Sequence, residues 1–308
     1  MPLIRFPDPS IASETLGEYG YDLRITQLEK GSLSAHVAGT SCEEALFLEF
    51  GSDRTMLLQG QSIPGYLEFA MCVPGSENWF HGSTTTGGQL CGYNAGLTDN
   101  NCRHKGVMKL IMLPLQKIYA YLLECNAHLA AERLMATNWV NLTPEQSAEF
   151  MRVYGMGASG RLTKAEQCYN LITCLLSTPG EAELYGPTKN ERLLRRMVEL
   201  AHDEAEGEAL SLLEITRFLN CKDSTLRDAC VKAYGISVKQ LFKMVRLEQV
   251  RCSLAKPEAL NTVEAAFAKY GFGVDNISRH RKLYRETFGE RPVDTQQRGL
   301  GQLMLQLH

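Results

Sequence analysis

Four cations lie within seven consecutive residues near the C-terminal end of the chain, in 279-RHRKLYR-285, with no acidic residue among them. The surrounding stretch, 276–289, ends at a glycine and carries apolar residues at helical spacing: Ile277, Leu283, Tyr284 and Phe288. A helix packed on these residues leaves a polar face outside, made of Ser278, Arg279, Arg281, Lys282 and Arg285. Exposed Lys and Arg attract phosphate groups, so this face predicts contact with a nucleic-acid backbone.

A second exposed helix is predicted about fifty residues earlier, in 223-DSTLRDACVKAY-234, and it ends at Gly235. Its inward residues are Leu226, Ala229, Cys230 and Ala233. The outward set, with one turn residue, is Lys222, Ser224, Thr225, Arg227, Asp228 and Lys232. Arginine pairs with guanine through two hydrogen bonds, and a carboxylate accepts one from cytosine. For Asp228, an ion pair with Lys232 four residues on is equally expected.

A short helix precedes each of these two helices. The first covers 210–220, and Asn220 in its turn tolerates the left-handed conformation. The second covers 262–272 and ends at Gly271, and a longer helix over 237–255 links the two pairs. A scaffold helix, a tight turn and an exposed second helix form the helix-turn-helix plan, so the sequence predicts two tandem units.

The charge of the chain is unevenly distributed. The whole chain carries a net charge of −3, but residues 191–298 hold 19 Lys and Arg against 16 Asp and Glu, and the remainder carries −6. Starting at Glu214 instead gives 16 cations against 10 acids. A basic C-terminal region on an acidic body predicts a polyanionic partner for one domain only.

Residues 190–298 resemble the AraC/XylS family of transcription regulators. The resemblance is carried by 226-LRDACVKAYGIS-237, 246-RLEQVR-251, 271-GF-272 and 288-FGERP-292. It implies two recognition helices in successive major grooves on one side of the duplex. The base-facing positions that it implies are Ser224, Arg227, Asp228, Ser278, Arg279 and Lys282. The implied phosphate contacts are Lys222, Lys232 and Arg281.

The sequence departs from the family's pattern at several core positions. Cys230 stands where an aromatic residue is usual, and Thr216 takes the place of a small residue. Ala266-Phe267 replaces a larger aliphatic residue followed by Ala. His280 also occupies a normally aromatic place, and it is either a packed neutral residue or a phosphate contact.

Residues 20–115 favour short β-strands separated by Gly and Pro, which is typical of a barrel or sandwich. One hairpin is expected in 45–58 with its turn at Gly51-Ser52. Helices are expected over 115–134, 144–154 and 163–177. A helical stripe, either a dimer face or internal packing, is formed by Leu115, Ile118, Leu122, Cys125 and Leu129.

The predicted fold class is α+β, with a cupin-like β-barrel and helices followed by an all-α domain; the cupin-like form is what the resemblance implies. We expect an effector-binding and dimerisation domain over 1–180, a linker over 181–190, a DNA-binding domain over 191–298 and a tail over 299–308. The linker boundary rests on 178-TPGEAELYGPTKN-190, which is rich in Gly, Pro and charge.

An effector site, if one exists, is best placed at 78-NWFHG-82, where Trp79 and Phe80 suit an apolar pocket and His81 suits a polar anchor. Ordinary core packing is the alternative for each of these residues. The histidines of this region lack metal-ligand spacing, so we expect no metal and no cofactor. The string 155-GMGASG-160 matches a dinucleotide motif, but it follows a predicted helix and favours a helix–helix turn.

Ten cysteines are scattered without a CxxC pair, which favours reduced thiols, with Cys125, Cys174 and Cys230 inside apolar helical patterns. Redox sensing stays open, and the best local candidate is 102-CRHK-105, where cations would lower a thiol pKa. The longest apolar runs are too short to span a membrane, and 1-MPLIRFPDPS-10 lacks a signal-peptide core. We therefore expect a cytoplasmic protein.

Together these features predict a sequence-specific, double-stranded-DNA-binding transcription regulator and not an enzyme. Its expected partners are promoter or operator DNA, a second copy in a homodimer, an unknown small-molecule effector and RNA polymerase. We expect no association with a membrane. Two alternatives remain: a cupin-type metal-dependent enzyme or ligand-binding protein fused to a helical interaction module, and a DNA-independent adaptor.

Overall fold

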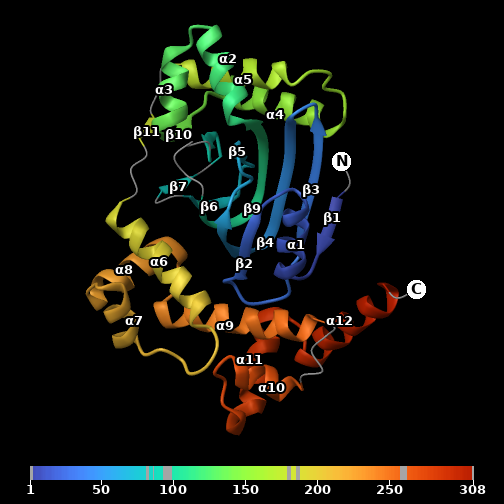
Figure 1. The fold of residues 1–308 in the computed structure, drawn as a ribbon, viewed down its shortest axis with the longest axis vertical. Coiled ribbons are helices and arrows are strands. Elements are labelled where there is room, and N and C mark those ends of the chain that lie inside the picture. The colour runs from blue at the N-terminus through green and yellow to red at the C-terminus, as the bar shows by residue number, and fades with distance from the viewer. Residues whose placement is uncertain are drawn as a thin grey trace. The chain divides into compact units, whose positions relative to one another are not determined.

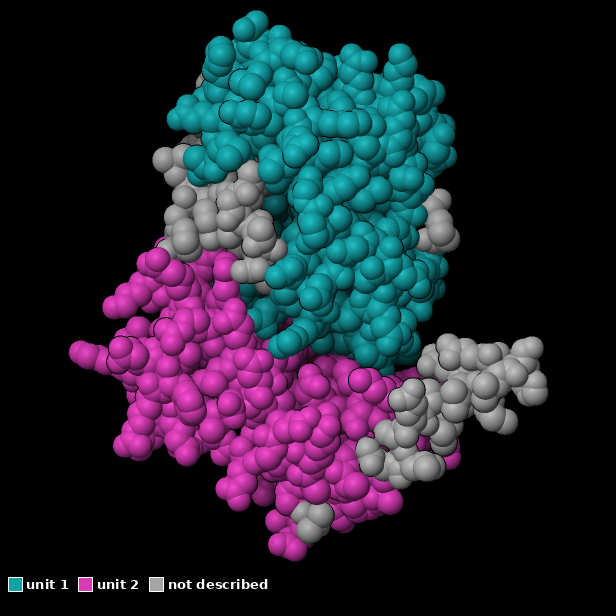
Figure 2. Space-filling model, viewed as in Figure 1, with its two compact units in different colours: residues 1–25, 34–53, 58–187 teal, residues 26–33, 54–57, 188–308 magenta. Residues whose placement is uncertain are grey.

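The computed structural model describes residues 3–80, 83–85, 87–92, 99–178, 182–184, 188–256 and 262–306 (Figure 1). The chain forms two compact units, coloured separately in Figure 2. Unit 1 comprises Met1–Ile25, Ser34–Asp53 and Leu58–Pro187, and unit 2 comprises Thr26–Leu33, Arg54–Leu57 and Thr188–His308. Both strands and helices are extensive, so the predicted α+β class is confirmed.

One antiparallel sheet contains all the described strands. They are β1 (Leu3–Phe6), β2 (Asp22–Gln27), β3 (Ala35–Cys42), β4 (Ala45–Gln61), β5 (Tyr66–Cys72), β6 (Glu77–Phe80), β7 (Ser83–Thr85), β8 (Gln89–Cys91), β9 (Asp99–Pro114), β10 (Thr137–Asn141) and β11 (Ala182–Leu184). The main path of pairing is β1-β3-β4-β9-β5-β8-β10-β11, with β2 on β4, and β6 on β7 and β9. Within the described residues this path does not return to β1, so closure of the predicted cupin-like barrel is not confirmed.

The predicted turn at Gly51-Ser52 is wrong, because both residues lie inside β4. This strand pairs with β3 from Cys42↔Ala45 through to Ala35↔Ser52. His36 is the cross-strand partner of Gly51, and a side chain at position 51 would collide with the His36 ring. The glycine therefore makes room for a neighbouring ring inside a strand, a use that the sequence does not distinguish from a turn.

The helices of unit 1 are α1 (Pro9–Glu18), α2 (Leu115–Glu124), α3 (His128–Ala136), α4 (Pro144–Ala158) and α5 (Glu166–Ser177). The helix expected over 115–134 is broken between α2 and α3, where Asn126 adopts a left-handed φ of 54°. Thr143 and Gln146 form both hydrogen bonds of the predicted capping box at the start of α4. The 155–160 string ends α4 and forms the turn that follows, in agreement with the expected helix–helix turn.

Helices α2 to α5 pack on the sheet around one apolar core. Phe47 and Phe69 from the sheet are fully buried there beside Ile118 and Leu122 of α2. The members of the predicted stripe therefore differ: Ile118 and Leu122 pack internally, whereas Cys125 is exposed and Leu129 is 41% exposed. Among the described helices, none has both the length and the apolar character needed to cross a membrane.

Unit 2 is built from helices in the described residues that follow position 188. They are α6 (Lys189–Asp203), α7 (Leu212–Leu219), α8 (Asp223–Tyr234), α9 (Val238–Ala255), α10 (Val263–Lys269), the 3-10 turn η1 (Val274–Asn276), α11 (Ile277–Phe288) and α12 (Pro292–Gln306). Helix α9 packs against α6, α8, α10 and α12, so it is the element on which the rest of this unit is assembled.

Candidate nucleic-acid interface

The α7–turn–α8 segment is fixed by its end residues. Ser211 and Glu214 form a complete capping box at the start of α7. Asn220 ends α7 with φ 50° and ψ 53°, the left-handed conformation expected from its side chain. Gly235 ends α8 with φ 72°, so the chain reverses at the predicted position and begins α9.

The inner face of α8 is packed mostly by small residues, with the Tyr234 ring buried at its end. Leu226 and Cys230 are both fully buried. The Cys230 thiol donates to the Ile236 carbonyl oxygen at 3.3 Å, and burial raises its pKa to about 12. A protonated, buried thiol behaves as a small apolar side chain, which explains how it occupies an aromatic place.

The outer face of α8 carries the predicted contact residues, and each of them is exposed or half-buried at the surface: Lys222, Ser224, Thr225, Arg227, Asp228 and Lys232. The Arg227 Nε donates to an Asp223 carboxylate oxygen at 2.6 Å, and this bond raises the Arg227 pKa. No ion pair joins Asp228 to Lys232 in the described part of this helix, so that alternative is wrong. The Arg227 side chain is instead held by the acid one turn earlier.

The 271-GF-272 pair has a specific structural role in the second helix pair. Gly271 has a left-handed φ of 74°, and a side chain there would collide with the Gly207 carbonyl and with Arg246. Phe272 is buried, and its ring meets Phe267 at 5.5 Å between centroids. Glycine is needed both for the turn and for the close approach of another segment.

The 288-FGERP-292 motif connects the end of α11 to α9. Arg251 of α9 is 1% exposed; it pairs with the Glu290 carboxylate at 3.2 Å and lies 4.6 Å from the Phe288 ring centroid. Glu290 also accepts a hydrogen bond from Arg298 of α12 at 2.6 Å. A buried charge is stable only when paired, so this network fixes α11 relative to both neighbours.

His280 packs between aromatic rings at the base of α11. Its ring lies 5.2 Å from the Phe272 centroid and 6.2 Å from the Phe267 centroid. Burial lowers the His280 pKa, and the positive charges of Lys243 and Arg279 lower it further. The structure therefore favours the packed, neutral alternative.

The outer face of α11 is exposed at every predicted contact residue: Ser278, Arg279, Arg281, Lys282 and Arg285. Arg281 forms an ion pair with Glu264 of α10. The sequence could show that these side chains face outward, but not that a scaffold-helix acid would hold one of them.

A basic groove beside α8 contains residues that the sequence did not single out. It has a volume of about 660 Å³, and its cations are Lys189, Arg192 and Arg196 of α6 with Lys222. Arg196 also donates to the Phe218 carbonyl oxygen at 3.3 Å. The α6 cations were missed because nothing in the local sequence indicates that they approach α8.

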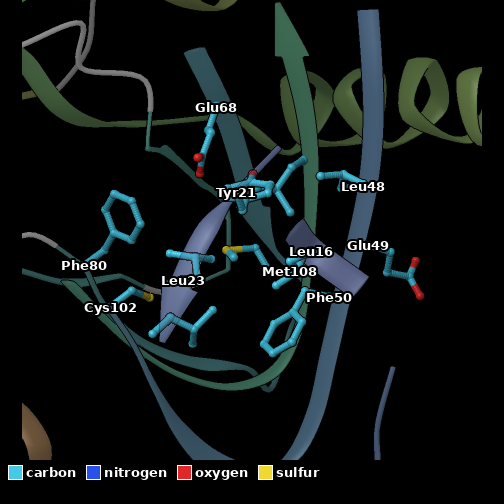
Figure 3. Close-up of a pocket in the computed structure, with 12 residues that line it drawn as sticks. Leu16, Tyr21, Leu23, Leu48, Glu49, Phe50, Glu68, Phe80, Cys102 and Met108 are labelled. Carbon is cyan, nitrogen blue, oxygen red and sulfur yellow. The ribbon is translucent and has the colours of Figure 1, made fainter. Parts of the chain in front are cut away.

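Unit 1 contains an apolar cavity of about 30 Å³, room for little more than one or two waters (Figure 3). Its lining is mostly aliphatic and aromatic, with Tyr21 and Glu68 as the polar residues that point inward. Burial raises the Tyr21 pKa, and Glu68 raises it further. Figure 3 shows the Glu49 carboxylate directed away, in agreement with its ion pairs to His36 and Lys109.

The three residues predicted to bind an effector do not all line this cavity. Phe80 lines it, whereas Trp79 is buried but is not part of its lining, and His81 lies outside the described residues. Tyr21 and Glu68 were missed because they lie far apart in the sequence, and no spacing relates them. Among the residues that the structure describes, no group of three or more His, Cys, Asp or Glu side chains is arranged to hold a metal ion.

The structure records all ten cysteines as thiols, but their environments differ from the predictions. Cys125 and Cys174 are exposed, although they fall within apolar helical patterns. Burial raises the pKa of Cys102, and the nearby Arg103 opposes this only in part. The expected lowering at 102-CRHK-105 is therefore wrong, because desolvation outweighs the neighbouring charge.

Comparison with known proteins gives likeness in structure only. No protein-family model and no curated protein sequence matches the chain. The AraC-like transcriptional activator CuxR is 14% identical, with a TM-score of 0.41 over 80% of this chain and 94% of that one. A probable AraC family regulator from Rhodopseudomonas palustris is 25% identical, with a TM-score of 0.32 over 35% and 97%. An apo form of ToxT from Vibrio cholerae, carrying one lysine-to-alanine change, is 10% identical, with a TM-score of 0.32 over 89% and 96%.

These TM-scores are low, so what the chain does has to follow from its own residues. The solved structures that it resembles are AraC-like transcriptional regulators, the family whose motifs its C-terminal sequence resembles.

Proposed function

We propose that the chain is a sequence-specific DNA-binding transcription regulator of the AraC/XylS type. The observation that carries this proposal is the surface position of every predicted contact residue on α8 and α11, two helices of one compact unit. Each follows a shorter helix and a turn, which supports two helix-turn-helix units. We assign DNA binding to 191–298, with 181–190 as linker, 299–308 as tail and 1–180 as the effector-binding and dimerisation domain.

The two outer faces suggest different roles. On α8, Ser224, Arg227 and Asp228 are placed for contact with base edges. On α11, Ser278, Arg279 and Lys282 are the base-facing set, with Arg281 and Arg285 at its sides. Lys222 and Lys232 flank the α8 face, where phosphate oxygens border a major groove.

The effector of this regulator would be a small, mostly apolar molecule in the unit 1 cavity, with Tyr21 and Glu68 as hydrogen-bonding groups. One of the solved structures that the chain resembles is wild-type ToxT with an unsaturated fatty acid bound. For this chain, a cavity of about 30 Å³ means that any effector must displace side chains to enter. Compounds that stabilise the wild type against heat, but not a Cys102→Phe variant with a filled cavity, would support this site. If no compound distinguishes the two, the site is wrong.

The remaining partners are proposed from the resemblance. A homodimer would read two half-sites, and the bound protein would contact RNA polymerase in the cytoplasm. Cys125 and Leu129 are the exposed members of the predicted stripe and would belong to the dimer face.

The function is tested by recovering genomic fragments that the purified chain retains and measuring their binding by gel shift. We expect Arg227→Ala and Arg279→Ala each to weaken binding to a recovered site by about five-fold or more, since a bidentate base contact contributes about 1–3 kcal/mol. A Lys164→Ala variant, in an exposed part of unit 1, serves as the control. If the chain enriches no fragment, it is not a sequence-specific DNA-binding protein.

A further inference from the structure

A second basic groove lies between α9 and α11, wholly within unit 2. It has a volume of about 750 Å³, and it is lined by the start of α7, the first half of α9, the Gly271-Phe272 turn and α11. We call it the α9–α11 groove. Its cations are Lys239, Lys243, Arg246, Arg279 and Lys282, and Glu286 is the acid in its lining.

One of these cations has a structural role. Arg246 is 4% exposed, and its guanidinium donates to backbone carbonyls of Glu204, Gly207, Glu208 and Tyr270 at 2.6–3.4 Å. A guanidinium surrounded by four carbonyl oxygens is satisfied by the protein, so Arg246 holds segments together and does not serve a ligand.

The other four cations are exposed and come from two helices. Lys239 and Lys243 lie one turn apart on α9, and Arg279 and Lys282 lie three residues apart on α11. Lys243 and Arg279 both lower the pKa of His280, which shows that cations from the two helices approach the same ring. The groove therefore concentrates positive charge along two helix faces and not at one point.

We propose that the α9–α11 groove binds the phosphodiester backbone of DNA, with Lys239 and Lys243 as its phosphate-binding residues. This inference rests on the proposed function. Helix α9 begins soon after the end of α8, at Val238, and leads to the second helix pair. If α8 and α11 enter successive major grooves, the segment that links them faces the backbone that separates those grooves. The linking helix then contributes to affinity as well as to spacing.

The extended placement of the cations distinguishes a DNA backbone from a small anion. A single phosphate group is best held by donors that converge on it, whereas a polymer can occupy cations spread along two helices. Arg279 and Lys282 also belong to the predicted recognition face, so one continuous partner would contact both the face and the groove.

The test compares two double variants of the full chain that each remove two exposed positive charges. Lys239→Gln with Lys243→Gln removes the α9 cations, and Lys164→Gln with Lys256→Gln removes two lysines that do not line the groove. Binding of a fluorescent random-sequence duplex of about 25 base pairs is followed by anisotropy from about 50 to 300 mM KCl. A random duplex isolates phosphate contacts, because these carry the sequence-independent part of binding.

Each phosphate contact contributes about 0.9 to the slope of log affinity against log salt. The groove variant should therefore lose about 1.8 of slope, and the control should keep the wild-type value. If all three proteins have equal slopes, the proposal that the α9–α11 groove binds the DNA backbone is wrong, whereas the proposed function is unaffected. If the wild type binds no duplex at any salt concentration, it is the proposed function that fails. A competition experiment with pyrophosphate at constant ionic strength gives a further check. If pyrophosphate inhibits DNA binding by the wild type but not by the groove variant, the groove is a small-anion site and the proposal of a DNA-backbone site is overturned.

Discussion

Helices α8 and α11 occupy equivalent positions in their helix pairs but differ in how they are packed and charged. The inner face of α8 is mostly small and aliphatic, around Leu226 and Cys230, with one aromatic residue, Tyr234, at its end, whereas α11 packs through Tyr284 and Phe288. Outside, α8 uses Asp223 to hold Arg227, while α11 presents a run of cations without an acid from 279 to 285. This contrast supports a role for α8 in selecting bases. It supports two roles for α11, which would bind the DNA phosphate backbone as well as contact bases.

The largest expected effect concerns the way in which each helix pair is stabilised. Glu290→Gln removes the carboxylate that forms an ion pair with the buried Arg251, so we expect a loss of about 3 kcal/mol in the free energy of unfolding. Ser211→Ala, which removes the cap of α7 in the first pair, should cost about 1 kcal/mol. Urea denaturation of both variants measures the difference. Equal losses would show that the Arg251–Glu290 pair is not what distinguishes the two helix pairs.

The second prediction compares the outer faces. Arg281→Gln with Arg285→Gln should weaken binding to a random duplex about ten-fold at about 0.15 M salt, because two phosphate contacts are lost. Ser224→Ala with Thr225→Ala on α8, which changes no charge, should change it by less than about two-fold, since base-edge contacts add little to non-specific binding. Anisotropy titrations under identical salt conditions test both variants. A larger loss from the α8 variant would reverse the assigned roles.

The third prediction releases Arg227 from its intrahelical partner. Asp223→Asn removes an acid from the predicted DNA face and frees the guanidinium, so affinity for a random duplex should rise about three-fold. The same change should lower helix stability slightly, because a carboxylate at a helix N-terminus is favourable. Glu264→Gln, which frees Arg281 of α11, is the matched variant, and a decrease in affinity with both would contradict the prediction.

The smallest expected effect is a pH dependence of the second helix pair. The His280 pKa is lowered in the folded state, so the folded protein binds fewer protons than the unfolded chain as the pH falls through the ordinary pKa of about 6.5. The free energy of unfolding should therefore fall as the pH drops below that value. Because the ring is partly exposed, we expect this contribution to stay under about 1 kcal/mol. His280→Phe should reduce the fall between about pH 7 and 5, and an unchanged fall would show that His280 does not contribute.

The sequence predicted local features wherever one residue type determines a local conformation. The left-handed Asn220, the capping box at Thr143 and the outward faces of α8 and α11 all follow from neighbouring residues. Features that depend on residues far apart in the sequence were either not predicted or predicted wrongly. Gly51 is required by a ring on another strand, and the Tyr21–Glu68 cavity joins residues that no spacing connects. Closure of the sheet depends on pairing between its ends, which local alternation does not specify.

The central claim is that α8 and α11 read two separate groups of bases on one side of the duplex. It is tested most directly by selecting bound sequences from a random library with the wild type, Arg227→Ala and Arg279→Ala. We predict that each variant loses base preference in its own window, with the two windows about 10 base pairs apart, one helical turn of DNA. Loss of preference at the same positions in both variants, or at none in either, would contradict this claim.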